Sequence, residues 1–190
     1  MCEEAIEQVA EALATGNVGL ARRIKEDGSV IDQMERDIET RCMKLLLHQQ
    51  PVARDLRLVS AALKMITDME RIGDMSEDIA DIVVVLNGRT MKGMEIVLEM
   101  AIEASKMVNA SVEAFVKKDV ALAKAVLEQD DIVDDYFAEI KQYIIGLIAK
   151  NIEDGELALD LLMISKYFER IGDHATNVAE WVIYSVTGTH

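Results

Sequence analysis

The sequence predicts an all-α protein made of two tandem antiparallel three-helix bundles. The first observation is an internal repeat, because the five residues from Glu70 to Asp74 (Glu-Arg-Ile-Gly-Asp) recur unchanged from Glu169 to Asp173 in a chain of 190 residues. The second is a composition that is 51% hydrophobic but only 4% aromatic, which favours helices over sheets. The third is that turn signals are few and separate six long segments, which we expect to pack as antiparallel neighbours.

Turn residues divide the first half of the chain into three helices. Gly16 is suited to a left-handed cap at the end of the first helix, and Asn17 to the N-cap of the second. Pro51 is suited to the first turn of the third helix, and Asn87-Gly88 to its end. These signals place helices at 1–15, 18–48 and 52–87.

The second half of the chain carries a matching set of signals. Asp119 follows two lysines and is suited to an N-cap, and the segment from Asn151 to Gly155 reads as a turn. These signals place helices at 91–118, 120–150 and 155–186.

The two halves align with a simple offset, which defines two repeats at 1–88 and 89–190. The offset is 102 residues from Met1 to about His48 and 99 residues after that, so the second repeat is shorter at its second turn. In this alignment Met1 pairs with Glu103. The first helix of repeat one therefore lacks about ten residues that repeat two has.

A stripe of small and apolar residues at spacings of three and four runs along the third helix and predicts the face turned to the core. Its members are Leu58, Ala62, Met65, Met69, Ile72, Ser76, Ile79, Val83 and Leu86. The sixth helix carries the same stripe. Its members are Leu157, Leu161, Ile164, Phe168, Ile171, Ala175, Val178, Val182 and Ser185.

The net charge of −15 is spread evenly, with −7 in the first 88 residues and −8 in the rest. Such a field repels phosphate backbones and anionic lipids, so direct nucleic-acid binding and membrane-surface binding are unfavoured, whereas cations and basic protein surfaces are suitable partners. Cys2 and Cys42 are read as free thiols in a reducing cytoplasm. The longest apolar stretches are too short for a transmembrane segment. The sequence leaves both a monomer and a homodimer open.

Each copy of the repeated motif places two carboxylates one turn apart on one helix face, where like charges repel unless a cation lies between them. The heptad positions turn this face away from the core. In the third helix the face holds Glu70, Asp74, Glu77, Asp78 and Asp81, and in the sixth helix Glu169, Asp173, Asn177 and Glu180. Gly73 and Gly172 lie beside the carboxylates, although glycine is unfavourable in mid-helix, which suggests close approach of another helix or a bound group.

Repeat two adds a further carboxylate pair, Asp130 and Asp134, on its second helix. Oxygen ligands suit hard cations such as Mg²⁺, Mn²⁺, Ca²⁺ or Fe³⁺, and two converging pairs suit a multinuclear cluster. Asp78 and Asn177 are further candidate metal ligands, and Asp32 and Glu77 are secondary ones. His174 is either a ligand, a hydrogen-bond partner of one, or a solvated side chain. The alternative for the whole acidic face is plain solvation.

The doubled Glu-Arg-Ile-Gly-Asp motif, together with the segment from Gln49 to Arg57 (Gln-Gln-Pro-Val-Ala-Arg-Asp-Leu-Arg), resembles the PhoU family of phosphate-uptake regulators. The resemblance covers essentially the whole chain. It implies two three-helix bundles, a cytoplasmic location and a negative regulator of phosphate-starvation signalling that affects transcription indirectly. It also implies contacts with the phosphate ABC transporter, especially its ATPase subunit, and with the phosphate-sensing histidine kinase.

The resemblance further implies metal binding at paired Glu/Asp-x-x-x-Asp motifs, with iron clusters or zinc among the ions, and manganese or magnesium as alternatives. These motifs fall on Glu70 with Asp74, Glu169 with Asp173, and Asp130 with Asp134. In repeat one, Gly28 stands where repeat two has Asp130, so Asp32 lacks its partner and the first site is expected to be weaker, lower in nuclearity or empty.

The sequence shows no catalytic signature, such as a Gly-rich phosphate loop, His-Glu-x-x-His or the Glu-x-x-His of di-iron bundles, so we expect a protein that is not an enzyme. Two alternatives to the metal-binding regulator stay open. One is a metal-independent acidic helical adaptor, and the other is a metal-dependent hydrolase.

Overall fold

The computed structural model describes residues 1–89, 93–150 and 155–189, and these form six helices, which confirms the predicted all-α class. The helices of repeat one are α1 (Cys2–Thr15), α2 (Val18–Gln49) and α3 (Arg54–Leu86). Those of repeat two are α4 (Met94–Lys117), α5 (Val120–Lys150) and α6 (Gly155–Thr187). Most of the expected turn from Asn151 to Gly155, and the expected start of the fourth helix at residue 91, lie outside the described residues.

The predicted capping residues act at most of the helix ends. Gly16 is left-handed at φ 65°, and the Asn17 side chain accepts a hydrogen bond from the Leu20 N–H at 3.0 Å. Asp119 caps α5 in the same way. The prediction for Pro51 is wrong, because α3 begins only at Arg54, after Ala53 adopts a positive φ of 47°.

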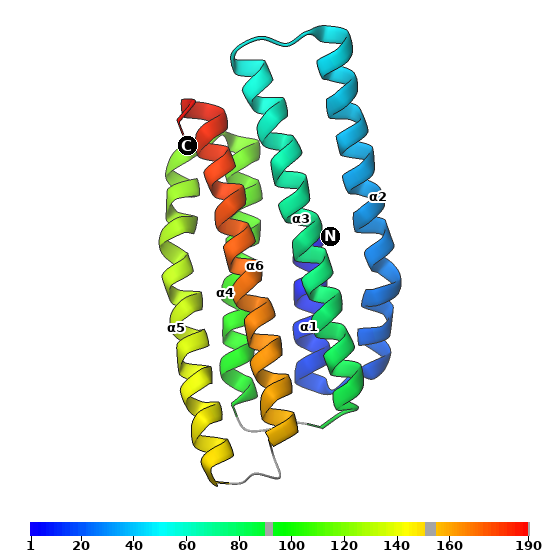
Figure 1. The fold of residues 1–190 in the computed structure, drawn as a ribbon, viewed down its shortest axis with the longest axis vertical. Coiled ribbons are helices and arrows are strands. Elements are labelled where there is room, and N and C mark those ends of the chain that lie inside the picture. Colours follow the sequence, from blue (N-terminus) through cyan, green and yellow to red (C-terminus); the bar gives the residue numbers. More distant parts are fainter. Residues whose placement is uncertain (90–92, 151–154, 190) are drawn as a thin grey trace.

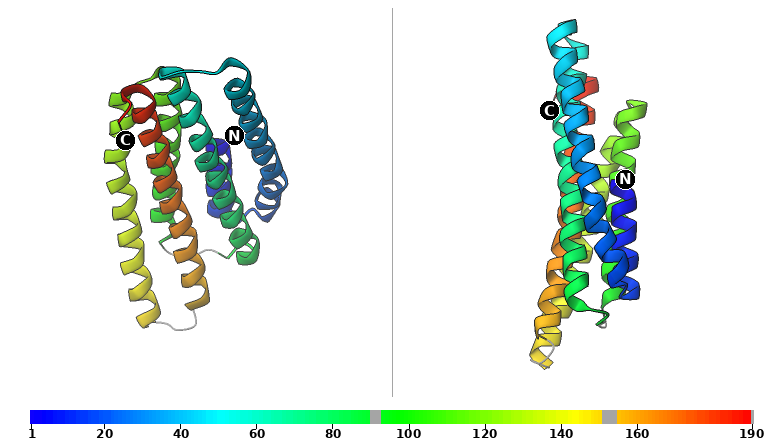
Figure 2. Two further views of the ribbon diagram at one scale, coloured as in Figure 1. Left: turned by 45° about the horizontal axis from the view of Figure 1, so that its top comes forward. Right: turned by 90° about the vertical axis from the view of Figure 1, so that its right-hand side faces the viewer.

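The six helices form two layers. Helices α5, α6, α3 and α2 lie side by side in one layer, and α1 and α4 lie together behind them (Figure 1). The edge-on view in Figure 2 separates the two layers. Since α3 and α6 are antiparallel neighbours at the centre, the two repeats are related by an approximate two-fold axis between them.

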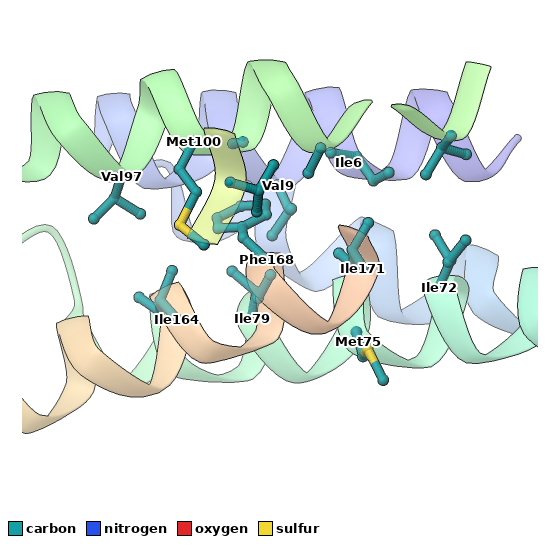
Figure 3. Close-up of a cluster of buried hydrophobic side chains, with 14 of the residues drawn as sticks. Ile6, Val9, Ile72, Met75, Ile79, Val97, Met100, Ile164, Phe168 and Ile171 are labelled. Atoms are coloured by element: carbon teal, nitrogen blue, oxygen red, sulfur yellow. The ribbon is translucent and has the colours of Figure 1, made fainter. Parts of the chain in front are cut away.

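One core fills the space between the layers and joins the two repeats. Phe168 of α6 is fully buried and lies near Val9 of α1, Ile79 of α3 and Met100 of α4 (Figure 3). The predicted stripes supply much of this core. Of their members, Leu58, Ala62, Met69 and Leu157 are half-buried, and the others are buried.

Two features of the fold bear on the predicted function. As the repeat alignment predicts, α1 has 14 residues and α4 has 24. Among the described residues, no helix is long and apolar enough to cross a membrane.

Candidate metal centre

Two glycines let neighbouring helices approach each other beside the predicted carboxylates. A Cβ atom on Gly73 of α3 would lie 3.0 Å from the Ile31 side chain of α2, and one on Gly172 of α6 would lie 3.4 Å from Val133 of α5. The close approach of a helix, inferred from the cost of a mid-helix glycine, is therefore what the structure shows at both positions. It brings the acidic residues of α2 and α5 next to those of α3 and α6.

The tightest group of carboxylates lies where α2 meets α3. One carboxylate oxygen each from Asp32, Glu70 and Asp74 lie within 4.8 Å of one another. Burial and the neighbouring acids raise the pKa of Glu70 and Asp74, and the Arg71 guanidinium opposes this rise only in part. Three crowded carboxylates of this kind are a suitable ligand set for a hard cation, since a cation would relieve their mutual repulsion.

Glu77 joins this group because Gly28 leaves room for it. The Glu77 carboxylate lies against Gly28, and a Cβ atom at that position would overlap it. Burial, followed by Asp74 and Asp32, raises the pKa of Glu77. We call Asp32, Glu70, Asp74 and Glu77 the first carboxylate cluster.

Repeat two builds its group from different positions. Asp130 and Asp134 of α5 face Glu169 and Asp173 of α6, and we call these four residues the second carboxylate cluster. Burial raises the pKa of Asp130 from its ordinary value of 3.8 to about 6, with further contributions from the other three acids. Burial and Glu169 also raise the pKa of Asp173.

The two clusters are thus related by an exchange of one carboxylate. Repeat one has Gly28 and Glu77 where repeat two has Asp130 and Thr176. Each cluster therefore holds four carboxylates, and repeat one has as many as repeat two although Gly28 stands in place of an Asp. The repeat alignment alone does not reveal this exchange, because the two differing positions lie on different helices.

Lys166 gives the second cluster a different electrostatic environment from the first. Its ammonium group forms an ion pair with Glu169 and lies 5.3 Å from the centre of the Phe137 ring. Repeat one has Thr67 at the equivalent position. Within the part of the chain that the structure describes, only Asp32, Glu70 and Asp74 form a group of three or more potential ligands this close together.

The remaining predicted ligands lie at the contact between α3 and α6. Asp68 accepts hydrogen bonds from Asn177 Nδ2 at 3.1 Å and pairs with His174 Nδ1 at 2.8 Å. The Tyr167 hydroxyl donates a hydrogen bond to Asp78. Burial and the negative charge of Asp78 raise the pKa of Tyr167. Under the repeat offset of 99, these are equivalent contacts, since Asp68 corresponds to Tyr167 and Asp78 to Asn177.

The structure therefore gives Asp78, His174 and Asn177 a role in joining the two repeats. Asp78 also lies near enough to the first cluster to raise the pKa of Asp74 and Glu77 slightly. Sequence reasoning misses Asp68, because neither its neighbours nor its spacing distinguish it from other surface acids.

Comparison with known proteins shows the same family along the whole chain. The family model described as PhoU domain matches residues 1–83 and 97–182. The chain is 33% identical over 190 residues to phosphate-specific transport system accessory protein PhoU homolog 1 of Thermotoga maritima, covering 99% of this chain and 82% of the relative. It is 35% identical to the PhoU homolog of Pseudomonas aeruginosa, covering 100% of this chain and 79% of the relative.

Solved structures agree. The crystal structure of PhoU from Pseudomonas aeruginosa matches with a TM-score of 0.95 at 33% identity, covering 99% of this chain and 91% of that one. The phosphate transport system regulatory protein PhoU from Streptococcus pneumoniae matches with a TM-score of 0.89 at 27% identity, covering 99% and 89%.

Proposed function

The chain belongs to the PhoU family of phosphate transport accessory proteins, and from that starting point we propose that it controls phosphate uptake and phosphate-starvation signalling as a metal-binding regulator. PhoU proteins are regulatory and accessory proteins, not enzymes. The observation that carries the metal-binding part is the convergence of Asp32, Glu70 and Asp74, with ligand oxygens within 4.8 Å of one another.

The residues present fit a hard cation. In the first cluster Asp32, Glu70, Asp74 and Glu77 would hold it, and in the second Asp130, Asp134, Glu169 and Asp173. Iron, manganese, magnesium and zinc are the candidate ions, and four carboxylates in each cluster are enough to bridge more than one of them. A bound cation would supply neutralising charge and coordination positions open to water or an anion.

The protein's own residues prepare both clusters for such an ion. Gly73 and Gly172 fix the spacing of the helices, so the carboxylates are held together by packing of the core. Burial first, and the neighbouring acids second, raise the pKa values of Glu70, Asp74, Asp130 and Asp173. A bound cation would favour the ionised form of these carboxylates.

We further propose that the protein acts in the cytoplasm by docking onto the ATPase subunit of the phosphate ABC transporter and onto the phosphate-sensing histidine kinase. Support comes from the family and from the net charge of −15, which favours basic partner surfaces. Metal at the clusters would lower the local negative charge and so change how strongly such surfaces are attracted.

The test replaces the cluster acids by neutral amides in cells whose own copy has been removed. We expect Glu70→Gln/Asp74→Asn combined with Glu169→Gln/Asp173→Asn to leave a phosphate-starvation reporter active in phosphate-rich medium. The matched control is Glu7→Gln/Glu11→Gln, two exposed acids one turn apart on α1. Normal repression by the cluster variant would argue against the metal-binding regulator and for the metal-independent adaptor.

A further inference from the structure

Lys166 of α6 brings a positive charge to the second carboxylate cluster. Its ammonium group forms an ion pair with Glu169, which lies three residues further along the same helix. The Lys166 side chain is 44% exposed, whereas the Glu169 side chain is only 13% exposed. The ammonium group therefore reaches from the surface to a carboxylate that the fold largely encloses.

The ring of Phe137 on α5 helps to hold Lys166 at this position. The Lys166 ammonium lies 5.3 Å from the centre of the ring, and the Lys141 ammonium lies 5.2 Å from it. A cation at such a distance is attracted by the face of an aromatic ring. Phe137 is half-buried and packs against the core, so its ring is fixed in place. Lys166 is thus held between this ring and a carboxylate of its own helix.

Repeat one has acidic and neutral residues at the two equivalent positions. Thr67 stands in the place of Lys166, and Glu35 in the place of Phe137. The negative charge of Glu35 contributes to the raised pKa of Glu70. The first cluster therefore has a further acid beside it where the second cluster has an aromatic ring and an ammonium group.

Two cations lie near the first cluster, but neither takes the part that Lys166 takes in the second. The Arg71 Nε lies 3.6 Å from Glu70, and its side chain is 56% exposed. Both copies of the repeated motif carry this arginine, so it does not account for the difference between the clusters. Lys25 forms its ion pair with Asp81, which is not a member of the cluster.

We propose that Lys166 is a built-in counterion of the second cluster, which competes with a metal ion for Glu169. This inference rests on the proposed function, because it concerns the metal that the cluster would bind. A metal ion must separate Glu169 from Lys166 and then lie near the displaced ammonium group, and both effects lower its affinity. The Phe137 ring offers the displaced ammonium a position beside the cluster. Lys166 therefore raises the metal concentration at which the second cluster fills.

Calorimetric titration with Mn²⁺ tests this inference in a chain whose first cluster is disabled by Glu70→Gln/Asp74→Asn. We expect the further change Lys166→Met to tighten Mn²⁺ binding about fivefold, since methionine keeps the apolar stem but removes the charge. Lys166→Arg keeps the charge and should bind Mn²⁺ no more tightly than its parent chain. A merely structural role of Lys166 predicts the opposite direction, because loss of support for the cluster would weaken binding.

The reverse change places a lysine at the first cluster. Thr67→Lys is made in a chain whose second cluster is disabled by Glu169→Gln/Asp173→Asn, and Thr67 is exposed, so a longer side chain has room. We expect Mn²⁺ binding about fivefold weaker than in the parent chain.

The matched control is Lys117→Met, tested in the chain whose first cluster is disabled. Lys117 forms an ion pair with Glu113 on α4, outside both clusters. This change removes the same charge and the same kind of ion pair as Lys166→Met, and it should leave Mn²⁺ affinity unchanged. Circular dichroism checks that each variant keeps its helices.

The outcomes separate this inference from the proposed function. Mn²⁺ binding by folded Lys166→Met that is no tighter than in its parent chain would overturn the inference, and so would unchanged binding in Thr67→Lys. If the wild type binds Mn²⁺ in the same experiments, the proposed function stands. No Mn²⁺ binding by the wild type would overturn both.

Discussion

Asp130 illustrates how a single carboxylate is held in an unfavourable state by its surroundings. Its carboxylate Oδ1 would lie 3.3 Å from a Cβ atom on Gly172, so it lies against α6 at this glycine. Burial there, followed by four neighbouring acids, raises its pKa to about 6. The same crowding that destabilises the free protein is what makes the position attractive for a cation.

The raised pKa of Asp130 makes stability depend on pH in a defined direction. Between its ordinary pKa of 3.8 and about 6, the folded chain holds more protons than the unfolded chain, so stability falls as the pH rises. Above pH 6 the loss is complete. We expect Asp130→Asn to raise the free energy of unfolding at pH 7 by about 1 kcal/mol, allowing for solvent screening, and to have little effect near pH 3.5.

Urea unfolding in chelator at both pH values measures this effect. Glu128→Gln, which changes an exposed acid on the same helix, is the control and should have little effect at either pH. A loss of stability at pH 7 in Asp130→Asn would mean that its carboxylate is stabilised by the fold and not strained by it.

At the scale of the helix, α2 and α3 meet where glycine replaces a side chain. A Cβ atom at Gly73 would lie 3.0 and 3.1 Å from two carbons of Ile31, which is tighter than ordinary packing. Gly146 in α5 differs, since a Cβ atom there would have no neighbour within 4 Å among the described residues. Gly73 is therefore required by the packing of α2 on α3, whereas Gly146 only lowers the helix propensity of α5.

This difference predicts that replacing glycine by alanine changes the free energy of unfolding differently at the two positions. Gly146→Ala should raise the free energy of unfolding by about 0.5 to 1 kcal/mol, because alanine is the better helix former. Gly73→Ala gains the same propensity but crowds Ile31, so we expect it to be at least about 1 kcal/mol less stable than Gly146→Ala. Chemical denaturation of the two variants checks this, and equal stabilisation by both would show that α2 can move away from α3 freely.

For the molecule as a whole, the two repeats are joined by polar contacts as well as by the core. Asp68 and His174 have side chains only 15% and 17% exposed, and they connect α3 to α6 together with Asn177. Tyr167 and Asp78 repeat this connection on the other side of the approximate two-fold axis. The first and second carboxylate clusters therefore lie in one assembly of helices that shares a core.

Removing Asp68 should weaken the contact between the repeats. Asp68→Ala leaves Asn177 and His174 without their shared acceptor, and we expect a loss of about 2 kcal/mol in the free energy of unfolding. Glu128→Ala is the matched control on a solvent-exposed face, where little change is expected. A loss below about 0.5 kcal/mol for Asp68→Ala would show that water replaces these contacts readily.

The shared core predicts that both repeats unfold together. Phe168 of repeat two packs with Val9 and Ile79 of repeat one, so neither repeat keeps a complete core alone (Figure 3). Trp181, the one tryptophan of the chain, reports on α6, whereas far-ultraviolet circular dichroism reports on all helices. Their urea transitions should coincide. Two separated transitions would show that the repeats are independent folding units.

Sequence patterns predict the helices, most of their ends and the core stripes, because these depend on spacing within one helix and on local turn chemistry. The start of α3 is the exception. The patterns also indicate that Gly73 marks a close approach. The exchange of Asp130 for Glu77 could not be predicted in this way, since it depends on which residues of α2 and α3 meet. For the same reason the contacts of His174 and Asn177 with Asp68 cannot be predicted from the sequence, since they depend on how α3 packs on α6.

The most direct test of the account is the amount of metal held by each repeat. The chain is loaded with Mn²⁺ or Fe³⁺, freed of unbound metal, and analysed for metal by mass spectrometry as wild type, Glu70→Gln/Asp74→Asn, Glu169→Gln/Asp173→Asn and the control Glu7→Gln/Glu11→Gln. We expect each cluster variant to lose the metal of its own repeat only, with the control equal to wild type. Wild-type protein without bound metal, or metal unchanged in both cluster variants, would contradict the assignment of the two carboxylate clusters as metal sites.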